Sequence, residues 1–184
     1  MAELFPRTGT LKLGYDVDEV NKYFALARRA YEEPGRSDEL AAFNVRRASF
    51  DLHRHGYATT AVDSALDRLE VAFSARVRER YIRDHGQDAW MADLAQRAQS
   101  LYPRLRRPAG ERFARPGSMS GGYDAREVDA LLDRITAFFD QGQALTADDI
   151  RSATFSRRAS WRAYDERVVD AYLARAVDIL LGVS

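Results

Sequence analysis

Two histidines stand at a spacing that could hold a metal ion. His53 and His55 flank Arg54, and alternate residues of a β-strand point to the same face, where two imidazoles can ligate one ion. The chain contains no cysteine, and no carboxylate at ligand spacing completes the set. We therefore expect no metal site, and the sequence indicates no cofactor.

Two pairs of carboxylates have a spacing that acid–base chemistry can use. Each pair lies one helical turn apart with an arginine beside it: Asp63 and Asp67 with Arg68, and Asp129 and Asp133 with Arg134. Paired carboxylates on one helix face could divide the roles of acid and base. Because ion pairs of this kind are common on helix surfaces, a solvated charged face is the preferred interpretation.

No motif of nucleophilic or nucleotide chemistry is complete. The stretch at 117–121 resembles the turn that holds a catalytic serine, but its third position is Met119. Neither a phosphate-binding loop with its lysine nor a dinucleotide-binding glycine fingerprint occurs in the sequence. We expect the protein not to be an enzyme.

The composition is that of a globular chain without a strong charge. Of 184 residues, 46% are hydrophobic, and 28 basic residues balance 28 acidic ones. These values fit one or two compact domains, and zero net charge gives no general attraction to nucleic acid, so we expect no nucleic-acid partner. No window approaches the roughly 18 apolar residues of a membrane-spanning helix, and the N-terminal residues lack the apolar stretch of a secretory signal. We expect a cytoplasmic protein.

A repeat organises the chain, because a tyrosine followed five residues later by a valine occurs four times. The pairs are Tyr15 and Val20, Tyr57 and Val62, Tyr123 and Val128, and Tyr164 and Val169, and Gly14, Gly56 and Gly122 precede three of the tyrosines. Counted from each valine, apolar residues recur at +3, +4, +7, +10 and +11, which is the spacing of one stripe along an α-helix. Each copy therefore predicts a helix whose stripe packs in a core.

The residues after each tyrosine predict where these helices begin. Three copies have an aspartate there, which is a good N-cap residue: Asp16, Asp124 and Asp165. Glu19 and Glu127, three residues after their aspartates, predict capping boxes in the first and third copies. The second copy lacks the aspartate, so we expect its cap at Thr59 or Thr60.

The predicted fold is mainly α, with four tandem loop-helix modules packed as helix pairs and one extra linking helix. Each loop contains a phenylalanine: Phe5, Phe43 or Phe50, Phe113, and Phe155. The second helix continues to His85, a separate helix runs from Asp88 to Tyr102 and ends at Pro103, and the fourth copy gains a helical turn at 146–150. The expected organisation is repeats one and two in 1–86, a helical linker in 87–108, and repeats three and four in 109–184.

The residue types of the repeat are as informative as their spacing. The segments FPRTGTLKLGYDVDEVNKYFALA, GGYDAREVDALLDRI and LTADDIRSATFSRRASWRAYDERVVDAYLARAV share a Gly-Tyr-Asp-x-x-Glu-Val-Asp signature with an upstream Thr-x-x-Asp-Ile and Phe. This pattern resembles the N-terminal domain of the DivIVA family of bacterial cell-division and polar-growth proteins. The resemblance implies a peripheral scaffold on the inner face of the membrane, which recruits partners and assembles through coiled coils.

The resemblance also implies a membrane-binding or partner-binding tip. In the family, an aromatic and a basic residue precede the Gly-Tyr pair, where the aromatic ring can enter the lipid interface and the base can meet anionic headgroups. The fourth copy keeps this pair as Trp161 and Arg162, with Arg157 and Arg158 nearby. The alternative for Trp161 is burial in the core, which is also the expectation for Trp90.

The other three tips depart from the family pattern. At the corresponding positions stand Lys12 and Leu13, Arg54 and His55, and Ser120 and Gly121, with Leu11 and Met119 as apolar neighbours. The sequence also has no long heptad-repeat segment, so filament-like assembly is not expected.

Two functional hypotheses follow. The first is a non-enzymatic DivIVA-like scaffold or adaptor that binds protein partners, with an anionic membrane surface as a second partner at the cytoplasmic face during division or growth. The second is a soluble helical protein-interaction module that has lost membrane binding, which the three degenerate tips favour. Monomer and homodimer both stay open.

Overall fold

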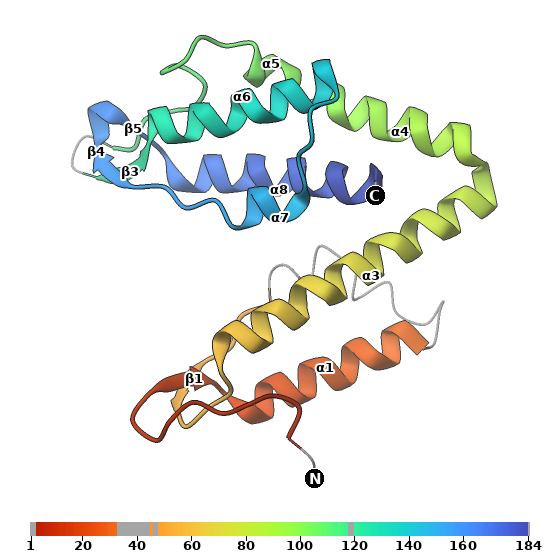
Figure 1. Ribbon diagram of the computed structural model, residues 1–184, viewed down its shortest axis with the longest axis vertical. Coiled ribbons are helices and arrows are strands. Elements are labelled where there is room, and N and C mark those ends of the chain that lie inside the picture. Colours follow the sequence, from red (N-terminus) through yellow and green to blue (C-terminus); the bar gives the residue numbers. More distant parts are fainter. Residues whose placement is uncertain (1–2, 33–44, 46–47, 118–119, 184) are drawn as a thin grey trace. The chain divides into compact units, whose positions relative to one another are not determined.

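A computed structural model describes residues 3–32, 45, 48–117 and 120–183. The chain is mainly helical, as the sequence predicts. It also contains two small antiparallel sheets, which the sequence analysis did not predict. It divides into two compact units, Met1–Arg80 and Tyr81–Ser184, each of which can be followed in Figure 1.

The first unit pairs two strands, each of which leads into a helix. β1 (Leu13–Tyr15) precedes α1 (Val17–Glu32), and β2 (Leu52–Arg54) precedes α3 (Thr59–His85), whose last turn belongs to the second unit. The strands are antiparallel, with Leu13 opposite Arg54 and Tyr15 opposite Leu52. The helix expected to end at His85 does so, and Gly86 follows it with a positive φ of 89°, which glycine adopts readily.

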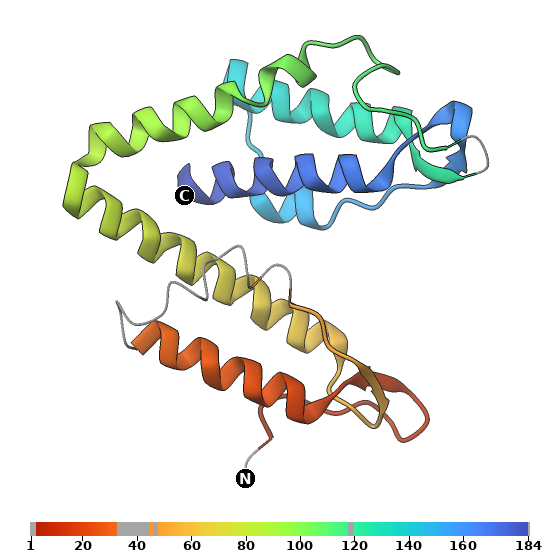
Figure 2. The same ribbon diagram turned by 180° about the vertical axis from the view of Figure 1, so that it is seen from behind.

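The second unit builds a three-stranded sheet at one end of a helical core. Its elements are α4 (Gln87–Gln99), α5 (Tyr102–Leu105), β3 (Gly121–Asp124), α6 (Ala125–Gln141), α7 (Ala147–Arg151), β4 (Arg157–Ala159), the 3₁₀ turn η2 (Ser160–Arg162), β5 (Ala163–Tyr164) and α8 (Glu166–Val183). β3 lies between β4 and β5 and is antiparallel to both. Helix α8 runs beside α6, with α7 against it, in both views (Figures 1 and 2).

The repeat valines lie at the centre of each core. Val20 and Val62 in the first unit and Val128 and Val169 in the second are all 0% exposed, so the packing role predicted for these valines is confirmed. The last member of the first stripe, Tyr31, is 46% exposed. Trp90 is buried as expected, and its indole N–H donates to the Gly182 carbonyl at 3.0 Å.

The same contacts recur in the two units. The Tyr15 ring meets Phe50 edge to face at 5.3 Å, and the Tyr123 ring lies 5.1 Å from Phe155. Tyr15 also exchanges backbone hydrogen bonds with Tyr57, as its counterpart Tyr123 pairs with Tyr164 across β3 and β5. Of the two candidate aromatics of the second loop, Phe50 therefore fills the role, and Phe43 lies outside the described residues.

The buried tyrosine hydroxyls repeat this correspondence. In the first unit, Tyr57 Oη donates to Asn21 Oδ1 at 3.1 Å and accepts from Leu4 N–H. In the second, Tyr164 Oη donates to Asp129 at 2.9 Å and accepts from the backbone N–H of Arg112.

The aspartates cap as predicted, but the capping boxes are wrong. Asp16 accepts from the Glu19 amide and Asp124 from the Arg126 amide. The Glu19 and Glu127 carboxylates do not fold back to these caps, because they accept instead from the backbone N–H groups of Asp51, at 2.8 Å, and Ser156, at 2.6 Å. These glutamates thus tie the loop of one repeat to the helix of the other.

Several predicted helix boundaries differ from the structure. The expected helix from Asp88 to Tyr102 is two helices, and Pro103 stands in the first turn of α5 instead of ending a helix, because a first-turn residue needs no amide donor. The predicted N-cap at Thr59 or Thr60 is wrong, because α3 already begins at Thr59. The predicted turn at 146–150 is α7, where Thr146 and Asp149 form a capping box. The structure assigns the helix expected in the linker, α4, to the second unit, where it packs on α8.

Candidate functional site

The candidate site is the end of the second unit, where η2 joins the two outer strands of the sheet. Gly122 pairs with Arg158 of β4, and Asp124 pairs with Ala163 of β5. The residues between these strands, Ser160–Arg162, therefore project beyond the sheet as a single 3₁₀ turn. Figure 1 shows this turn at the sheet end of the second unit.

Trp161 is a surface residue. Its side chain is 64% exposed, so the interpretation that places it in the core is wrong. The Arg162 guanidinium lies over the indole, with Cζ 4.3 Å from the ring centroid, a distance at which a cation is attracted to the ring face. The Arg115 guanidinium donates to the Trp161 carbonyl, which ties the turn to the segment before β3.

A basic pocket of about 400 Å³ lies beside the indole. Its walls combine one carboxylate with four arginines: Gly110, Arg115, Asp124, Ala125, Arg126, Arg158, Trp161 and Arg162. Asp124 is already engaged, because Arg158 Nε donates to it at 2.8 Å and lowers the pKa of its carboxyl. Within the described part of the chain, no carboxylate lies within ion-pair distance of Arg115, Arg126 or Arg162. The pocket therefore carries uncompensated positive charge.

The two remaining predicted tip residues are differently placed. Arg158 enters the pocket, but Arg157 pairs with Glu166, with 2.9 Å between Nε and Oε1. The sequence did not indicate Arg115 and Arg126 as tip residues. They reach the pocket because the irregular segment before β3 and the start of α6 meet at the sheet. No periodic signal in the sequence marks that meeting.

The signature residues form the frame under this tip. A methyl group on Gly122 would overlap the Tyr164 carbonyl oxygen, and one on Gly14 would overlap that of Tyr57, so both positions require glycine. Ala163 and Tyr164 are fully buried, and Asp165 accepts from the Arg167 amide at the start of α8. These residues act structurally, by bringing the strands close together.

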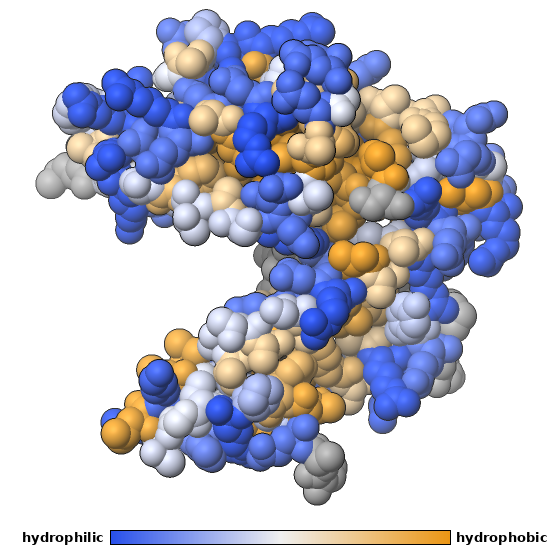
Figure 3. Space-filling model, in the orientation of Figure 1, coloured by the Kyte–Doolittle hydropathy of each residue, from blue (hydrophilic) through white to orange (hydrophobic). Residues whose placement is uncertain are grey.

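The first unit has a tip of a different composition. Leu11, Leu13 and Leu52 are 87%, 56% and 54% exposed, and β1 pairing brings Leu13 opposite Arg54. Figure 3 shows apolar side chains gathered at this strand end. Leu11 and Leu13 were named from the sequence, but Leu52 was not, since its contribution depends on the pairing of β1 with β2.

The residues considered for metal binding or catalysis do not lie together, and each histidine makes only local contacts. His53 Nε2 lies 4.0 Å from Asp16 Oδ2, and His55 Nδ1 lies 3.0 Å from the Thr8 carbonyl. In the described ranges, no group of three or more histidine, aspartate or glutamate side chains could hold a metal ion. Ser118 and Met119 lie outside the described residues.

The two carboxylate pairs also differ from their expected character. Asp129 is 6% exposed, so its place on a solvated face is wrong. Its carboxylate accepts from Tyr164 and from the Gly110 amide, while Arg112 binds Asp133 at 2.5 Å. Asp63 is exposed and contributes, after burial, to the raised pKa of Tyr15. Neither pair lines the basic pocket beside Trp161.

Comparison of the chain with protein-family models, curated protein sequences and solved structures finds no match. Over the residues that the structure describes, no helix combines the length and apolarity needed to cross a membrane.

Proposed function

We propose that this chain is a non-enzymatic adaptor of the DivIVA type, which attaches to an anionic membrane surface through the tip of its second unit and holds protein partners there. It is built from two pairs of loop-helix repeats, one pair in each unit. The chemistry of the tip is binding: the described residues around its pocket are arginines, an aspartate, a tryptophan and small residues, without a nucleophile–base pair.

One observation carries this proposal: the exposed tryptophan of η2 lies beside a pocket that is lined by uncompensated arginines. An indole at 64% exposure can enter the boundary between headgroups and acyl chains. Arg115, Arg126 and Arg162 surround a pocket in which a phosphate oxygen could accept several guanidinium hydrogen bonds. A membrane surface supplies both the apolar and the anionic partner that this turn lacks within the chain.

The repeat architecture is supported by matching contacts between residues far apart in the sequence. Glu19 and Glu127 tie their helices to the loop of the following repeat. Tyr57 and Tyr164 place their hydroxyls between a backbone amide and a side chain of the preceding repeat's helix. Duplication of one two-repeat unit explains both sets of contacts.

The tip of the first unit supports the alternative function, a protein-interaction module. In the second copy Arg54 stands at the position that Trp161 takes in the fourth, and three exposed leucines lie at the tip of the first unit. Such an apolar tip suits a protein contact as well as lipid. An interaction module without membrane binding is therefore the second candidate, and it makes a different prediction for vesicles.

Vesicle sedimentation separates the two candidates. The wild type is expected to sediment with vesicles that contain anionic lipid and not with neutral vesicles, and more weakly as salt rises. Trp161→Ala is expected to reduce binding about tenfold and Arg162→Ala about fivefold, on the scale of roughly 1 kcal/mol for each basic residue at an anionic surface. Arg83→Ala, an exposed arginine outside the tip, serves as the matched control.

Absence of wild-type binding to anionic vesicles would overturn the membrane part of the proposal and leave the soluble interaction module. Equal loss in Arg83→Ala and Arg162→Ala would show that only general charge is involved.

A further inference from the structure

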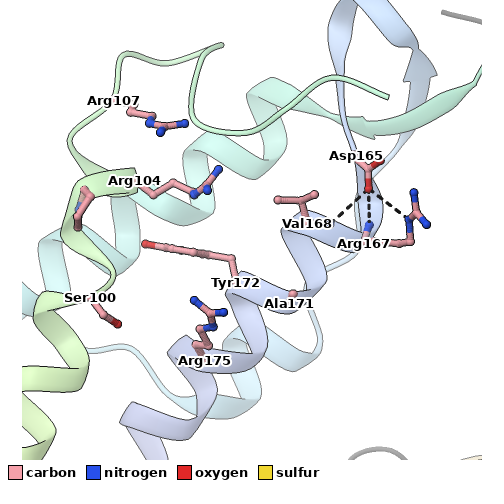
Figure 4. Close-up of a pocket in the computed structure, with 10 residues that line it drawn as sticks. Ser100, Arg104, Arg107, Asp165, Arg167, Val168, Ala171, Tyr172 and Arg175 are labelled. Atoms are coloured by element: carbon pink, nitrogen blue, oxygen red, sulfur yellow. Dashed lines mark hydrogen bonds and ion pairs between the residues drawn. The ribbon is translucent and has the colours of Figure 1, made fainter. Parts of the chain in front are cut away.

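A second basic cavity, of about 550 Å³, lies in the second unit away from the tip. It runs between the α4–α5 segment and α8, as Figure 4 shows. Each side contributes residues at the same intervals: Ser100, Pro103, Arg104 and Arg107 on one side, and Val168, Ala171, Tyr172 and Arg175 on the other. On α8 this i, i+3, i+4, i+7 spacing is one continuous face about two turns long. The opposite side of the groove is formed by the end of α4, by α5 and by the turn that follows α5.

The floor of the groove is apolar and fixed. Tyr172 extends from α8 toward the α4–α5 segment (Figure 4), is 7% exposed, and its hydroxyl donates to the Leu101 carbonyl at 2.9 Å. Phe113 meets the same ring edge to face at 5.3 Å. Val168 and Pro103 complete an apolar strip beside it. Because these side chains are held by the core, the floor is formed before any ligand arrives.

The rim of the groove carries more positive than negative charge. Four arginines line it, at positions 104, 107, 167 and 175, against one carboxylate, Asp165. Asp165 accepts from the Arg167 and Val168 amides at the start of α8, and its Oδ1 lies 3.8 Å from Arg167 Nε, so it compensates one of the four arginines. Among the residues that the structure describes, neither Arg107 nor Arg175 has a carboxylate within ion-pair distance.

One of these arginines is held in position. Arg104 donates to the Arg112 carbonyl at 2.9 Å, and its Cζ lies 4.9 Å from the Phe113 ring centroid. Its guanidinium therefore loses little freedom when an anion binds, which favours affinity. Carboxylates are suitable anions, because arginine donates to them through two parallel hydrogen bonds.

We propose that this groove binds an acidic amphipathic helix of a protein partner, with its apolar stripe on Tyr172 and Val168 and its carboxylates against Arg104, Arg107 and Arg175. A free anion such as phosphate would pair with the rim but leave the apolar floor uncovered. A helix with apolar residues at i, i+3, i+4 and i+7 matches the length and both chemistries of the groove. This inference rests on the proposed adaptor function for the nature of its partner, but it uses none of the tip residues.

A synthetic peptide can test the groove in the full-length chain. The probe is a fluorescein-labelled 15-residue peptide with leucines on one helical stripe and glutamates elsewhere, measured by fluorescence anisotropy. Two matched peptides accompany it: one with glutamine for every glutamate, and one of the same composition scrambled so that leucines share no face.

The acidic amphipathic peptide is expected to bind, and both matched peptides are expected to bind at least tenfold more weakly. Arg175→Glu and Arg107→Glu are each expected to weaken binding about tenfold, on the scale of one hydrogen-bonded charge pair. Both side chains are exposed, so these variants should keep the helical circular dichroism of the wild type. Arg68→Glu, an exposed arginine of the first unit, makes the same change in total charge and should leave binding unaltered.

Three results would overturn the proposal: no binding of the acidic peptide, equal binding of the scrambled peptide, or complete displacement by millimolar inorganic phosphate. The Trp161→Ala variant separates this test from that of the tip, because it should bind the peptide like the wild type. Peptide binding without vesicle binding would support the groove proposal and contradict the membrane part of the proposed function.

Discussion

Tyr57 and Tyr164 occupy the same place in the two units but face different partners. Tyr57 donates to the neutral Asn21, whereas Tyr164 donates to the buried carboxylate of Asp129. A buried carboxylate needs a compensating charge. Arg112 supplies it: its side chain is 9% exposed, and it contacts Asp129 at 3.8 Å and Asp133 at 2.5 Å.

Removal of Arg112 should therefore destabilise the second unit strongly. Arg112→Ala leaves Asp129 buried without its counter-charge, and we expect a loss of about 3–5 kcal/mol in the free energy of unfolding. Urea denaturation followed by circular dichroism measures it. The double variant Arg112→Leu with Asp129→Asn reproduces the Leu4 and Asn21 of the first unit, and should recover much of that loss. A loss in the double variant equal to the sum of the losses in Arg112→Leu and in Asp129→Asn would contradict the coupling.

Tyr164 also predicts how stability depends on pH. Burial, followed by the hydrogen bond to Asp129, raises its pKa to about 12, although the Arg112 amide opposes this rise. Because the folded pKa exceeds the ordinary value of 10, the stabilisation is complete below pH 10 and falls as the pH approaches 12. Between these values Tyr164→Phe should lose stability less steeply than the wild type, by up to about 1.4 kcal/mol per pH unit. Parallel stability curves in denaturant titrations would rule this out.

At the scale of elements, each sheet depends on a close approach between two backbones. A Cβ on Gly14 would lie 2.8 Å from the Gly56 carbonyl carbon, too close for either strand to accept without moving. We expect Gly14→Ala to cost about 1–3 kcal/mol of unfolding free energy, as overpacking does. Gly9→Ala is the matched control, because a Cβ there meets nothing within 4 Å. Equal thermal shifts for the two variants would show that β1 tolerates displacement.

The sequence predicts helices better than it predicts the elements that hold the tip. The valine stripes and the end of α3 could be located because a periodic pattern over many residues leaves few alternatives. Strands such as β2, three residues long with all side chains exposed, carry no alternation that a sequence could show. The glutamates expected in capping boxes accept instead from the backbone amides of Asp51 and Ser156. These amides come close to the glutamates only in the folded chain.

The tip itself could be predicted in part for the same reason. Trp161 and Arg162 are adjacent in the chain, so a motif can mark them. Arg115 and Arg126 lie more than thirty residues away and join them through β3 pairing with its neighbours. The groove that we propose for an acidic helix likewise needs two segments far apart in sequence.

At the scale of the whole chain, the described residues form buried cores of unequal size in the two units. The described core of the second unit is one continuous cluster that includes nearly every inward residue of α8, from Val169 to Leu181. The described residues of the first unit form two smaller clusters, around Val20 and around Ala27. Apolar burial is the main source of stability, so the first unit should open more readily.

Hydrogen exchange followed by mass spectrometry can measure this difference. Amides of α8 are expected to exchange slowest, and those of β1 and β2 at least tenfold faster, because local opening of a small core needs less free energy. Equal protection in the two units would indicate that they unfold together.

The central claim, that Trp161 enters an anionic membrane surface, is tested most directly by its own fluorescence. The chain has two tryptophans, so a Trp90→Phe variant with unchanged circular dichroism leaves Trp161 as the reporter. We predict that its emission shifts to shorter wavelength with anionic vesicles and stays constant with neutral ones, while Trp161→Phe, which reports from the buried Trp90, shows no shift with either. An emission maximum of Trp161 that does not move with anionic vesicles would contradict the claim.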